Sequence, residues 1–243
     1  MTILVVGATG ATGQLLVEQL LNRGHKVKVI VRSPEKLAKA VANNDQLSVI
    51  SASLLELSDS EMIKYTNKCD AVVSCLGHNL NLKGIYSQPH KLVRDATNRL
   101  CNAIKANNSG KPTKYILMNT TGNSNRDLNE PISFGEKCVI GLIRLLLPPH
   151  VDNEMAADYL RINIGQEDKE IEWVAVRPDS LINEEIVTKY QVYPSPIRSA
   201  IFNAGQTSRI NVGHFMADLI TDENVWNKWK GQMPVIYNEA STK

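Results

Sequence analysis

A glycine-rich turn at residues 7–13 constrains this chain more than any other feature. The sequence Gly-Ala-Thr-Gly-Ala-Thr-Gly follows an apolar run at 3–6 and leads into a helical apolar stripe, and a second apolar run follows at 27–31. Strand, turn, helix and strand within about thirty residues form the unit that binds dinucleotides. Such a turn lets its backbone approach a pyrophosphate, whose charge then lies at the helix N-terminus. A tight turn without a ligand is the alternative.

Apolar, β-branched runs alternate with helical patterns along most of the chain, which predicts an α/β fold with a doubly wound parallel sheet. Beyond residue 178 this pattern loosens. We therefore expect a single domain over 1–243, in which 1–178 form the cofactor-binding core and 179–243 a small substrate-side lobe. Predicted strands are 2–6, 26–31, 47–51, 71–74, 114–119, 172–177 and 233–237. Predicted helices are 10–23, 35–41, 58–65, 90–107, 152–164, 197–204 and 212–220.

Three segments lack a regular pattern, at 79–89, 123–136 and 183–196. The first two follow the carboxyl ends of predicted strands, where ligands bind in open α/β sheets. Their Asn, Gly, Ser and Pro content suits loops that close over a site. Plain surface connections are the alternative.

Charge and cysteine content exclude several classes of partner. The 27 basic and 25 acidic residues give a net charge of +2 without a basic tract, so we expect no nucleic-acid partner. The apolar stretch at 139–147 is too short to span a bilayer, and we expect a packed helix there and no membrane partner. Met1 leads directly into a strand, which predicts no secretory signal. Four cysteines without metal-ligand spacing predict reduced thiols, no metal site and a cytoplasmic protein.

The end of the second predicted strand carries a cation where dinucleotide-binding proteins select their cofactor. Arg32 and Ser33 follow this strand, and the first acid is Glu35. An acid here binds the ribose 2′-hydroxyl, whereas a cation accommodates a 2′-phosphate. The donors of Arg32 and Ser33 suit a phosphate, so the sequence predicts NADP in preference to NAD. A solvated Arg32 beside a Ser33 that only caps a helix is the alternative.

Small and hydroxyl-bearing residues follow two central strands. Cys75-Leu76-Gly77 at the fourth strand would let a dinucleotide cross the sheet edge, although Gly77 could be only a turn residue. Thr120 and Thr121 at the fifth strand could face the nicotinamide and orient a substrate carbonyl. Ordinary turn formation explains these threonines equally well.

Taken together, these segments resemble the atypical short-chain dehydrogenase/reductase superfamily, and within it the NAD(P)H-binding group of NmrA-like proteins, NADH-flavin reductase-like proteins and biliverdin reductase B. The resemblance implies a Rossmann fold and an NAD(P) cofactor over nearly the whole chain. It is carried by residues 7–13, Arg32-Ser33, 120–122, the stretch Trp-Val-Ala-Val-Arg-Pro at 173–178, and 207–212, where Asn211 stands at a position that is acidic in the group.

Two departures from that group bear on catalysis. Enzymes of the wider superfamily use Tyr-x-x-x-Lys, in which the lysine lowers the tyrosine pKa for proton transfer. Here Pro149 and Asn153 stand at those positions, and Tyr159 is followed four residues later by Asn163. Ser53 replaces an aspartate that lies near the adenine in many members, and it can still form hydrogen bonds.

Without the Tyr-Lys pair, the sequence predicts hydride transfer from NADP(H) to a small planar acceptor such as a flavin or quinone. Thr121 is the candidate orienting residue and His150 a candidate acid, although a histidine after two prolines is commonly exposed. The first alternative is a non-catalytic NADP(H) sensor resembling NmrA-like regulators, which would act on a protein partner. The second is an epimerase or dehydratase with a displaced base.

The candidate cofactor-binding residues are Gly7, Thr9, Gly10, Ala11, Thr12, Gly13, Arg32, Ser33, Ser53, Leu54, Cys75, Leu76, Gly77, Thr120 and Pro178.

Overall fold

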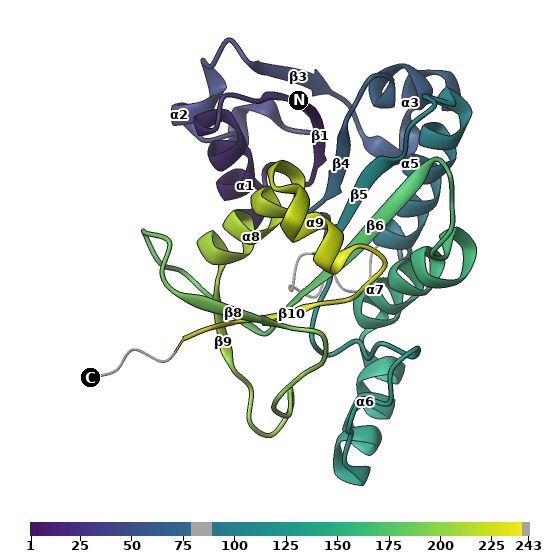
Figure 1. Cartoon of the computed structure of the whole chain (residues 1–243), viewed down its shortest axis with the longest axis vertical. Coiled ribbons are helices and arrows are strands. Elements are labelled where there is room, and N and C mark those ends of the chain that lie inside the picture. The colour runs from purple at the N-terminus through teal and green to yellow at the C-terminus, as the bar shows by residue number, and fades with distance from the viewer. Residues whose placement is uncertain (79–88, 240–243) are drawn as a thin grey trace.

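A central sheet organises the computed structural model, which describes residues 1–78 and 89–239, with residues 39 and 40 described by their backbone alone. Its eight strands run in the order β3-β2-β1-β4-β5-β6-β10-β8 (Figure 1). All neighbours pair in parallel except β10 and β8. The predicted doubly wound α/β fold is therefore confirmed. The strands of this sheet are β1 (Thr2–Val6), β2 (Lys26–Val31), β3 (Leu47–Ser51), β4 (Ala71–Ser74), β5 (Thr113–Met118), β6 (Ile171–Pro178), β8 (Tyr190–Tyr193) and β10 (Val235–Asn238).

Helices cover both faces of the sheet. One face packs against α1 and α8, which contact each other. The other face packs against α3, α5 and α7, and α5 contacts both of the other two helices. A separate two-stranded parallel sheet joins β7 (Ser180–Ile182) to β9 (Gln206–Ser208). The helices are α1 (Ala11–Asn22), α2 (Lys39–Ala42), α3 (Asp59–Thr66), α5 (Leu92–Asn107), α6 (Phe134–Leu146), α7 (Pro148–Asp158), α8 (Arg209–Thr221) and α9 (Glu223–Trp229), with short turns η1 (Pro34–Lys36) and η2 (Leu54–Glu56) and a π-helical turn η3 (Tyr159–Ile164).

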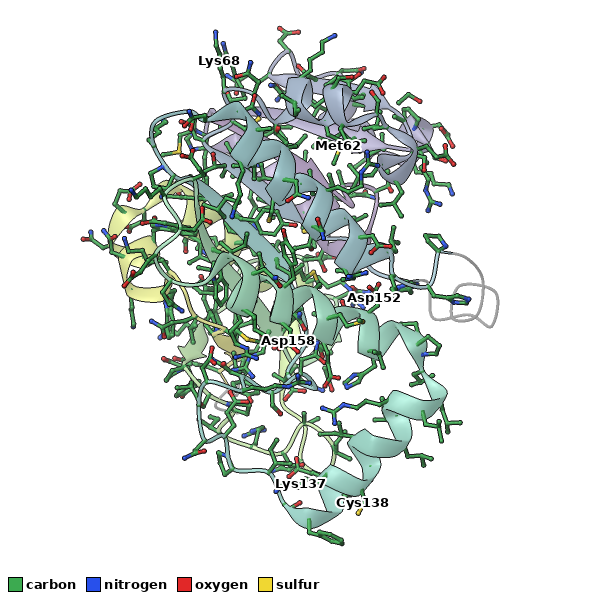
Figure 2. The ribbon with its side chains drawn as sticks, turned by 90° about the vertical axis from the view of Figure 1, so that its right-hand side faces the viewer. Met62, Lys68, Lys137, Cys138, Asp152 and Asp158 are labelled. Atoms are coloured by element: carbon green, nitrogen blue, oxygen red, sulfur yellow. The ribbon has the colours of Figure 1, made fainter. Side chains whose placement is uncertain are left out.

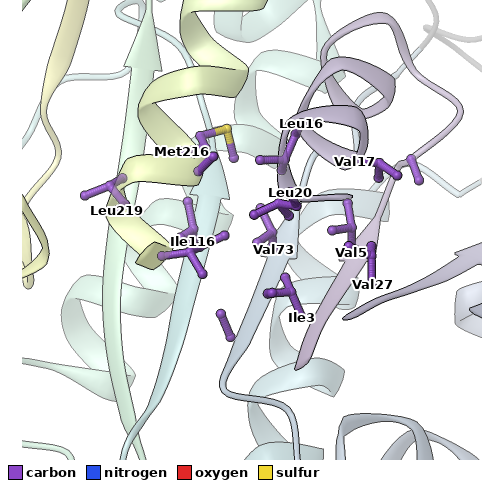
Figure 3. Close-up of a cluster of buried hydrophobic side chains, with 14 of the residues drawn as sticks. Ile3, Val5, Leu16, Val17, Leu20, Val27, Val73, Ile116, Met216 and Leu219 are labelled. Atoms are coloured by element: carbon purple, nitrogen blue, oxygen red, sulfur yellow. The ribbon is translucent and has the colours of Figure 1, made fainter. Parts of the chain in front are cut away.

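Two buried clusters, one on each face, account for the continuous apolar runs in the strands. In β1, Ile3 and Val5 face the α1 and α8 side, whereas Leu4 and Val6 face the α3 and α5 side. A central strand of a parallel sheet is buried on both faces, so its side chains are apolar at every position. Figure 3 shows the first cluster, in which Leu20 of α1 lies among strand and α8 side chains.

The C-terminal residues share this core. Helix α8 packs on α1, and β10 extends the sheet beyond β6. Ser208 caps α8 by accepting a hydrogen bond from the backbone N–H of Asn211. The fully buried Asn211 amide donates to Asn238 and Thr188, which an acidic side chain could not do.

Most predicted elements are confirmed, but the helix predicted over 35–41 is wrong. The chain forms the single turn η1 and then the short α2, separated by extended backbone at Leu37. The hydroxyl of Ser33 makes no capping hydrogen bond, although Pro34 does begin the turn. Leu37 and Val41 are both buried in the cluster that includes α1, and Leu37 joins it in an extended conformation instead of a helical one.

Three predictions beyond β5 also need correction. The helix expected from 152 begins earlier, at Pro148, because proline is favoured in the first helical turn. Residues 197–204 form turns rather than a helix, and α9 was not predicted. The unpatterned segments 123–136 and 183–196 contain the start of α6 and strand β8. The predicted loop over 79–89 lies outside the described residues except for Pro89.

The apolar stretch at 139–147 is helical, but the expectation that it packs is wrong. Most of it belongs to α6, where the buried residues are Glu136 and Ile140. Leu142 and Leu145 are more than half exposed, and α6 projects from the body of the molecule (Figure 1). Figure 2 shows the same helix from another side, with the labelled Cys138 at its outer surface. No helix within 1–78 and 89–239 is both long enough and apolar enough to cross a bilayer.

The buried cluster between α1 and α8 should dominate stability. We expect Leu20→Ala to lower the free energy of unfolding by about 2–5 kcal/mol, because it removes a fully buried side chain and leaves a cavity. Leu145→Ala, at a residue that is 78% exposed, should change it by less than about 0.5 kcal/mol. Urea denaturation followed by circular dichroism measures both, and equal effects would contradict the assignment of the core.

Candidate functional site

Close backbone contacts form the turn between β1 and α1. Gly7 has φ of +77°, and a Cβ atom there would lie 2.4 Å from the carbonyl oxygen of Cys75. A Cβ atom on Gly13 would lie 2.2 Å from the carbonyl oxygen of Gly7. Both positions require glycine, since a side chain would force the turn away from β4 and from its own helix. The turn is therefore a cradle that a Cβ atom would fill.

The N-terminus of α1 points out of this turn without a capping side chain. Its N-cap is Gly10, and the first turn of α1 contains no acid. The N–H groups of Ala11, Thr12 and Gly13 therefore have no side-chain acceptor at the positive end of the helix dipole. A pyrophosphate would satisfy these donors and be stabilised by the dipole.

Beside the turn lies a cavity of about 330 Å³, which brings together residues from five segments distant in sequence. It is bounded by the ends of β1 and β2, by the loop after β3, by Leu76 after β4, and by Pro89 and Leu92 at the start of α5. Six of the predicted cofactor residues line it: Gly7, Thr9, Arg32, Ser53, Leu54 and Leu76. Its charged lining residues are Arg32 and Glu56, and Glu56 comes from the loop after β3 rather than from the end of β2. The size and mixed lining suit an adenosine.

An arginine that the sequence did not single out supports the loop after β3, which lines this cavity. Arg99 of α5 donates hydrogen bonds to the carbonyl oxygens of Leu54 at 3.2 Å and Leu55 at 2.8 Å, and it also bonds Leu57 and Asp59. It thereby fixes the loop that carries Ser53 and Leu54. No pattern in the sequence indicates this role, because the contact spans more than forty residues.

The other predicted cofactor residues are not part of the cavity lining: Gly10, Ala11, Thr12, Gly13, Ser33, Cys75, Gly77, Thr120 and Pro178. Cys75 contributes its carbonyl to the contact with Gly7, and a Cβ atom on Gly77 would meet no atom of the described residues within 4 Å. The Thr120 hydroxyl accepts a hydrogen bond from the N–H of Gly122. The carbonyl of Pro178 accepts one from the N–H of Thr121 and so joins the ends of β5 and β6.

Thr121 is buried beside a carboxyl group at the end of β6. Burial raises the pKa of Asp179, although its hydrogen bonds with the backbone of Gly205 and Ser180 and with Thr121 oppose the shift. Thr121 also lines a small cavity with Gly122 and Arg198. The hydroxyl expected to orient an acceptor is thus shared with Asp179.

A buried ion pair anchors the loop after β5. The fully buried Arg177 contacts Glu130 at 2.6 Å and donates to the carbonyl oxygens of Met233 and Asn123. Glu130 also accepts from the N–H of Asn125. One guanidinium of β6 therefore holds this loop against the C-terminal segment. An arginine in an apolar strand was part of the family resemblance, but its partner was not predictable.

Helix α7 approaches the same edge of the sheet. The side chain of Asn119, after β5, donates to the carbonyl oxygen of Asn153 at 3.0 Å. His150 is largely buried, and its ring lies 3.3 Å from where a Cβ atom on Gly122 would be. His150 therefore faces the loop after β5 rather than solvent. Within the described part of the chain, no group of three His, Cys, Asp or Glu side chains is placed to hold a metal ion.

Glu154 links His150 to α6. Its carboxylate lies 3.5 Å from Nε2 of His150 and 2.7 Å from the guanidinium of Arg144. Burial opposes ionisation of Glu154, but the neighbouring histidine and arginine outweigh burial and lower its pKa to about 2. The carboxylate therefore stays charged over the physiological pH range.

The glycine cradle, the uncapped helix and the adjoining cavity define a Rossmann-type nucleotide-binding protein. The profile of the NAD(P)H-binding family matches residues 7–223, and the chain belongs to this family. The similar solved structures described here are less than 25% identical in sequence to this chain and show the fold alone. One is a Rossmann-fold NAD(P)-binding protein from Shigella flexneri, with a TM-score of 0.65 and 18% identity. The alignment covers 100% of this chain and 98% of the Shigella chain.

Two further similar structures belong to proteins with a named ligand or activity. A short-chain dehydrogenase/reductase from Veillonella parvula, solved with NADP, has a TM-score of 0.71 at 15% identity, with 100% and 96% coverage. A candidate NADH-flavin reductase from Streptococcus pneumoniae has a TM-score of 0.63 at 18% identity, with 98% and 100% coverage. An uncharacterised chloroplast protein of Arabidopsis thaliana is 36% identical over 75 residues, a match to 31% of this chain and only 27% of the Arabidopsis protein.

The pair formed by Glu154 and Arg144 gives a pH prediction. Because the Glu154 pKa falls from its ordinary 4.5 to about 2 on folding, its stabilisation is present above pH 4.5 and is lost as the pH falls toward 2. We expect Glu154→Gln to lower the unfolding free energy by about 2–3 kcal/mol at pH 7 and by little near pH 2. Urea denaturation across this range measures the difference. Glu18→Gln, at an exposed position on α1, is the control; a pH-independent loss in Glu154→Gln would contradict the assignment.

Proposed function

We propose that this protein is an NADP(H)-dependent oxidoreductase that reduces a small planar acceptor such as a flavin or quinone. Membership of the NAD(P)H-binding family supports the cofactor class. The observation that carries the choice of NADP is Arg32, which follows β2 and lines the same cavity as Gly7. Within the described residues it has no ion-pair partner, so its guanidinium is available to a 2′-phosphate.

The chain's residues have distinct roles in this proposal. The bound cofactor supplies a hydride. The N–H groups at the start of α1 bind the pyrophosphate, and the cavity beside them holds the adenosine. The loops after β4, β5 and β6 surround the place where an acceptor would bind, and Thr121 orients it there. With Pro149 and Asn153 at the positions of the usual Tyr-Lys pair, proton transfer needs another group.

A non-catalytic redox sensor is the second candidate, and one observation favours it. The exposed apolar side chains of α6, among them Phe134, Leu142 and Leu145, are of the kind that contact another protein. In such a sensor, the complexes with oxidised and with reduced cofactor would differ in their affinity for the partner protein. No acceptor would be turned over. For the enzyme we propose a small-molecule substrate, no nucleic-acid or membrane partner, and a cytoplasmic location.

The cofactor preference is tested by substitution of Arg32. We expect the wild-type protein to bind NADPH more tightly than NADH, and Arg32→Ala to lose roughly tenfold or more of NADPH affinity while NADH affinity changes little. Titration of cofactor fluorescence measures both. Lys64→Ala removes an exposed cation away from the cavity and should preserve the preference. An unchanged preference in Arg32→Ala would exclude the phosphate role.

Catalysis is tested with purified protein, NADPH and a panel of free flavins and quinones. We expect oxidation of NADPH, followed at its near-ultraviolet absorbance, well above the rate without protein for at least one acceptor class. Absence of turnover across the panel, together with normal NADPH binding, would favour the sensor over the enzyme.

A further inference from the structure

A buried histidine–aspartate pair lies beside the proposed site and has no part in the roles assigned so far. Nε2 of His78 is 2.8 Å from Oδ2 of Asp152, and the two side chains are 5% and 0% exposed. His78 follows the end of β4, and Asp152 belongs to α7. Two titratable groups are thus held together at the edge of the sheet where ligands of this fold bind.

Asp152 is fixed by the start of another helix. Its carboxylate accepts hydrogen bonds from the backbone N–H groups of Val93 at 2.8 Å and Arg94 at 2.9 Å. Figure 2 shows Asp152 where α7 meets the N-terminal end of α5. A carboxylate can only accept hydrogen bonds, so Nε2 of His78 carries a proton and donates it. The exchangeable position of the His78 ring is therefore Nδ1.

The position of His78 matches the path of a dinucleotide. Leu76, two residues earlier, lines the cavity proposed for the adenosine, and a Cβ atom on Gly77 would meet no described residue within 4 Å. Strand β4 lies between β1 and β5, so a cofactor that leaves the cavity toward β5 passes the end of β4. Helix α7 also contacts the loop after β5 through His150 and Asn153. These contacts place the pair on the nicotinamide side of the cavity.

We infer that His78, oriented by Asp152, is the residue that transfers a proton to the acceptor in the reaction proposed above. The inference rests on that proposed function. In the step, NADPH gives a hydride, with its electron pair, to a flavin or quinone, and Nδ1 of the His78 imidazolium gives a proton to a nitrogen or oxygen of the same acceptor. The products are NADP⁺ and the two-electron-reduced acceptor, and His78 regains its proton from solvent. Asp152 is the positioning residue, because its carboxylate stabilises the imidazolium and fixes the ring.

The other titratable groups described at this edge have different surroundings. The Asp179 oxygens accept from the N–H groups of Ser180 and Gly205, which belong to the C-terminal segment. Nε2 of His150 lies 3.5 Å from the Glu154 carboxylate without a hydrogen bond among the described residues, and that carboxylate is bonded to Arg144. On α5, Arg94 pairs with its neighbour Asp95. Among the described residues, Asp152 is the charged group in contact with the His78 ring.

The position of His78 can be tested without turnover. The nicotinamide ring is cationic in NADP⁺ and neutral in NADPH, whereas the phosphates are the same in both. In protein with ¹⁵N-labelled histidine, we expect the ring ¹⁵N chemical shifts of His78 to differ between the NADP⁺ and NADPH complexes at the same pH, because the cationic ring disfavours a protonated imidazole beside it. His78→Gln assigns the signal in nuclear magnetic resonance spectra.

His214 provides an internal control. It forms a similar pair with Asp218, at 3.1 Å, on α8, which packs on the opposite face of the sheet from α5 and α7. Its ring ¹⁵N chemical shifts should be the same in both complexes. Equal shifts of His78 in the two complexes would overturn the inference while leaving the proposed function intact. Failure to bind either cofactor, seen in the separate affinity titration, would overturn both.

His78→Gln also tests proton transfer, because the glutamine amide can still donate to Asp152 and the fold should be kept. With an acceptor that supports turnover, we expect kcat to fall roughly 100-fold and KM for NADPH to change less than about twofold. In the wild type, kcat should fall as the pH rises, because the proton donor is lost. The variant should lack this fall. An unchanged kcat and pH profile would exclude His78 as the proton donor.

Discussion

The contact between the glycine-rich turn and the end of β4 is the constraint on which the site depends. The carbonyl oxygens of Cys75 and Gly7 occupy the places where side chains on Gly7 and Gly13 would lie. This contact keeps α1 against the sheet with its N-terminal amides uncapped. The cavity beside the turn forms where the ends of β1 and β2 and the loops after β3 and β4 meet around it. An added methyl group at either glycine would therefore disturb both folding and anion binding.

Three polar side chains join this rigid core to the less regular segments around it. Arg99 holds the loop after β3, Asp152 holds the start of α5 together with His78, and Arg177 holds the loop after β5 through Glu130. All three satisfy backbone groups that would otherwise be buried without partners. The site is consequently formed by elements with fixed positions, as binding and catalysis both require.

The parts of the protein that sequence could predict are those with local causes. The strands of the sheet and the turn at 7–13 follow from apolar runs and from glycine, and Ser58 with Glu61 forms the capping box that begins α3. The mispredictions arise where local sequence does not decide tertiary contacts. Helix α6 has an apolar sequence typical of a buried helix, yet its buried residues are Glu136 and Ile140. Its burial depends on where the helix lies relative to the core.

The sequence by itself determined the fold class, strands β1 to β6 and β10, and the glycine-rich turn, because each rests on periodicity or on the unique freedom of glycine. It also predicts Pro149 and Asn153 at the positions of the usual proton-transfer pair. Only the tertiary structure decided which polar groups meet. The contact between His78 and Asp152 joins residues 74 positions apart, and nothing in local composition encodes such a distance. It arises because parallel strands bring their carboxyl ends, and the helices that follow them, to one edge.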